Sequence, residues 1–80
     1  MLAVESLVEQ FFAEEADDYV KEVLRAELRS RLSGSRYFTF NVFNVRLDFD
    51  AETATVEDEL ESGREESVPL ADFRARLEEA

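Results

Sequence analysis

The sequence predicts an α+β domain in which helices cover one face of a small antiparallel sheet. Three observations lead to this prediction. Apolar residues recur every three or four positions over 4–32, they alternate with polar residues over 36–60, and a short helical period returns over 70–77. The chain has 80 residues, which suffice for one hydrophobic core, so we expect a single domain over 1–80. The order of helix, hairpin and helix predicts a sheet of two or three strands.

The N-terminal period fits either one long helix or two shorter ones. Ser6 and Glu9 have the spacing of a capping box near its start. A single helix over 4–32 would span about 43 Å, which is long for a domain of this size. The alternative is a break near Glu14–Asp18, where Asp17 caps a second helix. Helical structure is expected to end at Ser33-Gly34-Ser35, with Gly34 in a left-handed conformation.

The next segment, 36–50, alternates like a strand but changes parity at Val42 and Phe43. A β-bulge near Phe43 or a break into two strands accounts for that change. The return strand is expected within 51–60, after a turn at Asp50-Ala51-Glu52.

The end of the chain combines a loop with a short helix. We expect 61–67 to be a loop and Val68 to belong to a short third strand. Pro69 and Asp72 are typical of a helix start. The buried face of that helix is predicted to consist of Leu70, Phe73 and Leu77.

The residue types argue against catalysis. The chain has no His and no Cys, the side chains that most often perform acid–base and nucleophilic chemistry at neutral pH. No glycine-rich phosphate-binding motif is present, since Gly34 and Gly63 stand alone. We therefore expect no enzyme activity and no cofactor.

One set of carboxylates has the spacing of a calcium-binding loop. Asp48, Asp50, Glu52 and Glu59 occupy its positions 1, 3, 5 and 12, but Thr53 stands where such loops need Gly. The flanking segments are strand-like rather than helical. We expect a solvated hairpin tip here and no metal site.

The composition also bears on location. No apolar run approaches the roughly 18 residues of a membrane span, and the N-terminus lacks the basic residues of a secretory signal. These features predict a cytoplasmic protein without membrane contact.

The net charge of −11 is the outstanding property of the composition. Such a charge repels nucleic acid and anionic lipid, and it attracts basic protein surfaces. Residues 51–80 contain ten acidic and three basic residues, so the excess is concentrated there. Carboxylates about 6–7 Å apart along a strand face resemble the phosphates of a duplex. The predicted partner-binding residues are Glu57, Asp58, Glu59, Glu61, Glu65 and Glu66, with Glu14, Glu15, Asp17 and Asp18 of the first helical turns.

Two other interpretations stay open. The chain has one Lys, eight Arg and no Ile, so the acidity can reflect host composition alone. The parity change can also leave Tyr37, Phe43 and Phe49 on an uncovered face, whereas the remaining strand phenylalanines belong to the core. An exposed aromatic strip, or a protruding long helix, would serve a regulatory interaction module or a homodimer seam.

In length, acidity and lack of catalytic residues, the chain resembles small phage-encoded inhibitors, among them anti-CRISPR proteins and anti-restriction DNA mimics. Toxin-immunity proteins and antitoxins have the same profile. The resemblance covers general character and no motif. It implies a stoichiometric inhibitor, monomeric or homodimeric, that occupies a basic surface on a nuclease or nucleic-acid-binding effector subunit.

Overall fold

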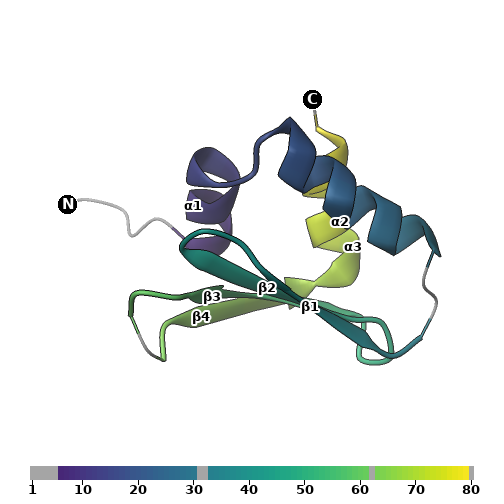
Figure 1. The fold of residues 1–80 in the computed structure, drawn as a ribbon. Coiled ribbons are helices and arrows are strands. Elements are labelled where there is room, and N and C mark those ends of the chain that lie inside the picture. The colour runs from purple at the N-terminus through teal and green to yellow at the C-terminus, as the bar shows by residue number, and fades with distance from the viewer. Residues whose placement is uncertain (1–5, 31–32, 62, 80) are drawn as a thin grey trace.

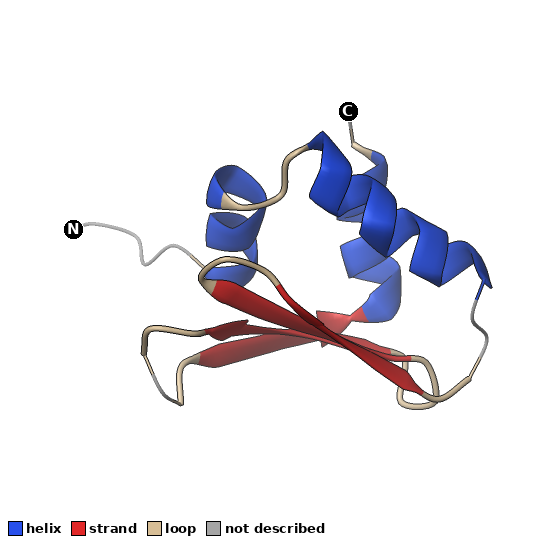
Figure 2. Ribbon diagram, in the orientation of Figure 1, coloured by secondary structure: helices blue, strands red, loops and turns tan. Residues whose placement is uncertain are grey.

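The computed structural model describes residues 6–30, 33–61 and 63–79 as three helices and a four-stranded sheet. The elements are α1 (Leu7–Glu14), α2 (Asp18–Ser30), β1 (Ser35–Thr39), β2 (Phe43–Asp48), β3 (Thr53–Asp58), β4 (Glu65–Pro69) and α3 (Leu70–Glu78). All neighbouring strands are antiparallel and follow in chain order. The helices lie on one face of the sheet (Figure 1), and no described helix covers the other face (Figure 2). The α+β prediction is confirmed, with one strand more than expected.

The N-terminal helical segment is two helices. The Ser6 hydroxyl accepts a hydrogen bond from the Glu9 amide at 3.0 Å and caps α1. After α1 ends at Glu14, the Asp17 carboxylate accepts from the Val20 amide at 2.9 Å and caps α2. A cap residue satisfies amides that have no partner inside the helix. Of the two alternatives that the sequence left open, the structure has the break, with Asp17 as the cap of the second helix. None of the described helices is long and apolar enough to cross a membrane.

The parity change in the aromatic segment is a break between two strands. β1 and β2 form a hairpin, and the Phe40 amide donates to the Phe43 carbonyl at 2.9 Å where the turn closes. Gly34 has the predicted positive φ of 81°, but it lies beyond the described end of α2 and leads into β1. The return strand is β3, as predicted.

The end of the predicted loop is strand instead. Glu65, Glu66 and Ser67 pair with β3 as part of β4. An edge strand needs apolar residues on one face only, and here Glu66 takes one of those positions, so the sequence carries little strand pattern. α3 begins after Pro69 and buries Leu70, Phe73 and Leu77, as predicted.

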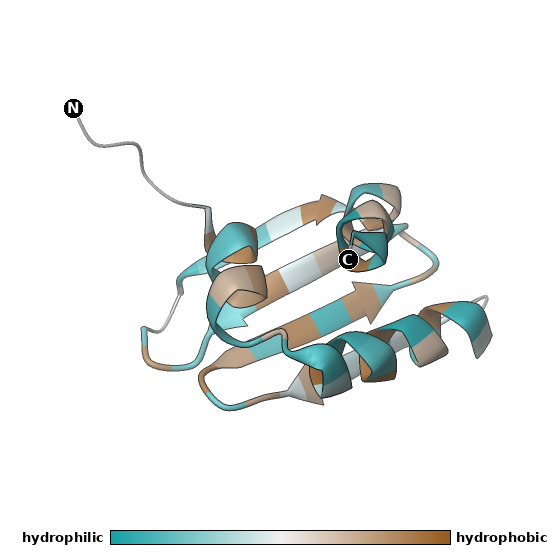
Figure 3. Ribbon diagram, turned by 90° about the horizontal axis from the view of Figure 1, so that it is seen from above, coloured by the Kyte–Doolittle hydropathy of each residue, from teal (hydrophilic) through white to brown (hydrophobic). Residues whose placement is uncertain are grey.

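The core lies between the sheet and the helices, and Figure 3 looks down on this arrangement from the helix side. Phe11 of α1 is its centre and has no exposed surface. Its ring centroid lies 5.3 to 6.3 Å from the rings of Phe12, Phe40, Phe43 and Phe73. These rings come from α1, the β1–β2 turn, β2 and α3, so Phe11 joins four parts of the fold.

Two arginines link α2 to α3 reciprocally. The Arg25 guanidinium of α2 donates to the Leu77 carbonyl of α3 through Nε at 3.1 Å and also through Nη2. Arg74 Nη2 of α3 donates to the Leu28 carbonyl of α2 at 3.5 Å. Both carbonyls lie in the last described turn of their helices. Each helix thus donates a side-chain hydrogen bond to the last described turn of the other.

Arg25→Met is expected to lower the free energy of unfolding by about 1–2 kcal/mol, because it keeps the apolar stem and removes the donors to Leu77. Urea denaturation followed by circular dichroism measures the change. The control is Arg29→Met on the same helix, whose exposed side chain pairs with the exposed Glu22 and is expected to contribute less than about 0.5 kcal/mol. Equal stability of the two variants would contradict the reciprocal link.

Candidate functional site

The uncovered face of the sheet is polar. In β2, Phe43, Val45 and Leu47 are buried beneath the helices, so the alternate residues, including Arg46, lie on the opposite, open face. The strand register extends this open face to all four strands. It comprises Ser35, Tyr37 and Thr39 of β1, Asn44, Arg46 and Asp48 of β2, Thr53, Thr55 and Glu57 of β3, and Glu65, Ser67 and Pro69 of β4.

Three carboxylates gather at one end of this face, and we call Glu57, Glu59 and Glu65 the acidic cluster. Glu57 of β3 lies directly opposite Glu65 of β4 in the register. Glu59 follows two residues after Glu57 and continues the pairing, since its amide donates to the Val42 carbonyl at 2.8 Å. The three line a hollow of about 310 Å³ together with Asn44, Asp58, Gly63 and Arg64.

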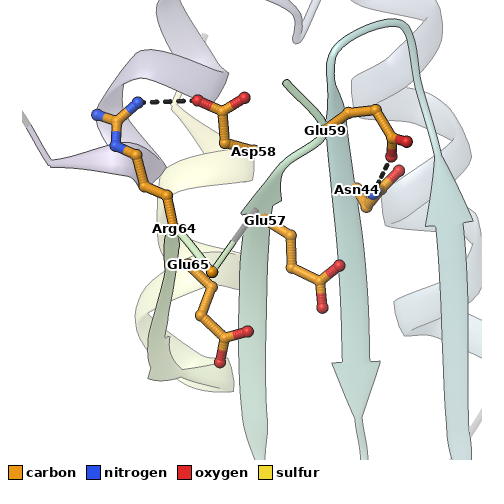
Figure 4. Close-up of a pocket in the computed structure, with 7 residues that line it drawn as sticks. Asn44, Glu57, Asp58, Glu59, Arg64 and Glu65 are labelled. Carbon is orange, nitrogen blue, oxygen red and sulfur yellow. Dashed lines mark hydrogen bonds and ion pairs between the residues drawn. The ribbon is translucent and has the colours of Figure 1, made fainter. Parts of the chain in front are cut away.

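Arg64, which also lines the hollow, does not neutralise the acidic cluster. Arg64 forms an ion pair with Asp58 at 2.9 Å and donates to Gln10 of α1 at 3.2 Å, so its guanidinium is turned toward the helix side of the sheet. Figure 4 shows the carboxylates of Glu57 and Glu65 extending away from the Arg64–Asp58 pair. Within the described part of the chain, no arginine or lysine lies within ion-pair distance of the acidic cluster.

Two hydrogen bonds hold carboxylates of the acidic cluster in place. The Tyr37 hydroxyl donates to Glu57 at 2.6 Å, and because Tyr37 is on β1 and Glu57 on β3, this bond spans β2. Asn44 Nδ2 donates to Glu59 at 2.6 Å. The Asn44 side chain is nearly enclosed, with 6% of the residue exposed, and its Oδ1 is buried without a donor among the described residues.

The bond to Glu57 raises the pKa of the Tyr37 phenol, and desolvation and the negative charges of Glu57 and Glu59 act in the same direction. The folded state therefore favours the protonated phenol. Its contribution to stability is complete below the unfolded pKa of about 10 and is lost as the pH rises through the higher folded value.

We expect Tyr37→Phe to remove this alkaline loss of stability. Urea denaturation in a series of buffers from neutral to strongly alkaline pH measures it, and the wild type should lose more stability than the variant over that range. Tyr19→Phe is the control, since Tyr19 is 74% exposed on α2; it should behave like the wild type. The same alkaline loss in Tyr37→Phe would disprove the role of the phenol.

Several acidic residues predicted to bind a partner are instead used within the fold. Glu66 accepts from the Val8 amide at 2.9 Å, and Glu15 accepts from the Val42 amide at 3.2 Å. Asp17 caps α2 and Asp58 pairs with Arg64, which also lies 3.8 Å from Glu61. Glu14 and Asp18 are exposed, but they lie at the α1–α2 junction on the helix side (Figure 1). The ten predicted residues therefore do not form one surface.

The calcium-binding loop and the exposed aromatic strip considered from the sequence do not coincide with the acidic cluster. Asp48, Asp50 and Glu52 lie at the β2–β3 turn, whereas Glu59 lies beyond the opposite end of β3. Among the described residues, no three or more His, Cys, Asp or Glu side chains are arranged so that they could hold a metal ion. The three residues of the suggested aromatic strip do not form an exposed surface. Phe43 and Phe49 are buried, with 3% and 9% of their surface exposed, whereas Tyr37 is exposed at 46%.

Sequence reasoning missed Asn44 and treated Tyr37 only as an apolar surface. The available signal was the polar Asn44 among the apolar residues of 42–47, which marks a position on the open face. Its contact with Glu59 depends on the β2–β3 register and has no local sequence signature.

Comparison of the chain with protein-family models, with curated proteins and with solved structures finds no match in any of the three. The arrangement of side chains on the open face is thus the basis for a functional hypothesis.

Proposed function

We propose that this chain is a non-enzymatic binding protein whose acidic cluster occupies a basic, nucleic-acid-binding surface on a nuclease or effector subunit. The observation that carries the proposal is the unneutralised pair of Glu57 and Glu65, directly opposite each other in the sheet. Like charges in that position destabilise a sheet. Because the pair disfavours folding, its presence favours a role outside the fold.

The position of the acidic cluster suits such a partner. Directly opposite side chains lie about 5 Å apart at Cβ, so Glu57 and Glu65 present two charges closely together. Glu59 adds a third beside them, on a sheet face without a covering helix. The net charge of −11 adds a long-range attraction that accelerates association with a basic surface. Such an inhibitor competes with nucleic acid for the same arginines and lysines.

The test is capture of a partner from host lysate by the immobilised chain, followed by elution with duplex DNA. The wild type should retain a basic nucleic-acid-binding protein that DNA displaces, and the captured protein should lose nuclease or nucleic-acid-binding activity when one equivalent of the chain is added. The variant Glu57→Gln, Glu59→Gln, Glu65→Gln should retain none.

A matched control removes three exposed charges elsewhere, with Glu14→Gln, Asp18→Asn and Glu52→Gln. It should capture the partner like the wild type. The proposal is wrong if the control loses as much binding as the cluster variant, or if DNA does not displace the partner.

A further inference from the structure

The outer edge of β1 carries backbone groups that no described residue uses. β1 is an outermost strand and pairs only with β2. The Phe40 amide donates to the Phe43 carbonyl, and the hydrogen bond at the other end of this ladder has the same phase. Every second residue before Phe40 is therefore hydrogen-bonded to β2, and the residues between them turn their amides and carbonyls outward. These are Ser35, Tyr37 and Thr39, and none has a backbone hydrogen bond to a described residue.

β4, the opposite edge, is protected against a further strand. The Asp58 amide donates to the Arg64 carbonyl, so the same alternation places Pro69 at an outward position, where it has no amide hydrogen to donate. Glu65 and the neighbouring Glu66 add charges to this strand. Proline and charged residues on an edge strand disfavour pairing with another chain. β1 contains neither proline nor carboxylate, so it is the edge that is open to strand pairing.

The single charge of β1 is held within the chain, and apolar surface accompanies the open edge. The Arg36 guanidinium lies 3.6 Å from Glu27 of α2 and 4.9 Å from the centre of the Phe38 ring. The contact with Glu27 places this side of α2 next to β1. Tyr19 and Val23 lie on the same side of α2, because they precede Glu27 by two turns and by one turn. Tyr19 is 74% exposed and Val23 is partly exposed.

We propose that β1 pairs antiparallel with β1 of a second copy of this chain, in a register centred on Tyr37. Tyr37 then pairs with its own counterpart, and Ser35 of each copy pairs with Thr39 of the other. In this register every outward amide of one strand meets an outward carbonyl of the other, whereas a shift by two residues leaves some of these groups without a partner. The two sheets become one continuous sheet, related by a two-fold axis as in closed symmetric dimers.

The side chains of β1 fit this self-pairing. The register places Arg36 of each copy opposite Phe38 of the other, on the helix face of the sheet. A guanidinium over an aromatic face is attractive, and Arg36 already makes this contact with the Phe38 ring of its own chain. No two charges of the paired strands stand directly opposite each other. These pairings favour a second copy of the chain over a strand of unrelated sequence.

The test is sedimentation equilibrium of the full chain from about 10 µM to about 1 mM, the affinity range of small interfaces. We expect a reversible monomer–dimer equilibrium. Dimerisation should strengthen between about 0.15 M and about 1 M salt, because salt screens the repulsion between two copies that each have a net charge of −11. The proposed partner binding has the opposite salt dependence, so the two interactions are distinguishable. A chain that stays monomeric under all these conditions would overturn the proposal and leave the edge to a strand of another protein.

Thr39→Pro tests the edge itself. It removes an outward amide that the sheet does not use, which an edge strand tolerates, whereas the dimer loses the symmetry-related hydrogen bonds from Thr39 to Ser35. We expect dimerisation to weaken at least about tenfold. Thr39→Val is the matched control, since it keeps the amide and the β-branched shape, and it should dimerise like the wild type. Equal dimerisation of the two variants would contradict the β1 pairing.

A measurement on the wild type makes the test independent of how well the proline variant folds. Amide hydrogen exchange of the ¹⁵N-labelled chain should be slow for Tyr37 where the dimer dominates and rapid where the monomer dominates. The Val45 amide, which is used inside the sheet opposite Phe38, should exchange at the same rate in both states. A Tyr37 amide whose exchange does not depend on protein concentration would also overturn the proposal.

Discussion

Phe11→Ala is expected to lower the free energy of unfolding by about 3–5 kcal/mol. Phe11 is fully buried, and the rings of Phe12, Phe40, Phe43 and Phe73 surround it, so the cavity would adjoin both helical and sheet elements. Domains of this kind have a total stability of about 5–15 kcal/mol, and small ones lie at the lower end. Urea denaturation by circular dichroism measures the loss.

The control for Phe11→Ala is Phe38→Ala. Phe38 is only partly buried, stacks on Phe40 at 5.9 Å and lies beneath the Arg36 guanidinium. It should lose clearly less stability than Phe11→Ala. A larger loss at Phe38 would show that the β1 edge, rather than the ring cluster around Phe11, is the main support of the fold.

The second large effect concerns binding. Replacing Glu57, Glu59 and Glu65 by glutamine is expected to lower the affinity for the captured partner about a hundredfold at low salt, if each charge contributes about 1 kcal/mol to binding. Calorimetric titration at two salt concentrations measures it. Wild-type affinity should fall steeply with salt, and the variant should show a flatter dependence because fewer charges are screened.

The matched control at Glu14, Asp18 and Glu52 changes the net charge equally. It should weaken binding only slightly, through the long-range field. An equal loss in both triple variants would mean that total charge, rather than the acidic cluster, determines affinity.

The sequence predicted most elements because their signals are local. Asp17 lies three residues before the amide that it caps, and the parity change at Val42 and Phe43 marks the end of one strand and the start of another. The sequence does not predict the first half of β4, because the polar Glu66 occupies a helix-facing position where a strand pattern calls for an apolar residue. There its carboxylate accepts a hydrogen bond from the Val8 amide at the start of α1. A contact between residues 58 positions apart has no local pattern.

The candidate site was predicted only in part for the same reason. Sequence places the carboxylates of 57–66 close together, but strand alternation divides them between two faces of the sheet. Glu57 and Glu65 lie on the open face, whereas Asp58 and Glu66 lie toward the helices and are used there. Arg64 pairs with Asp58 and also donates to Gln10, which lies 54 positions away in the sequence. Its orientation leaves Glu57 and Glu65 without an ion pair, and a local sequence pattern does not predict that orientation.

Glu57 and Glu65 stand opposite each other in the sheet at the expense of stability. The most direct measurement is the free energy of unfolding of Glu65→Gln, because the Glu65 side chain makes no ion pair with a described residue. We predict that it exceeds that of Glu14→Gln, an equal change of net charge, by about 0.5 kcal/mol at low salt, and that the difference shrinks at high salt. A Glu65→Gln variant that is no more stable than Glu14→Gln would contradict the claim.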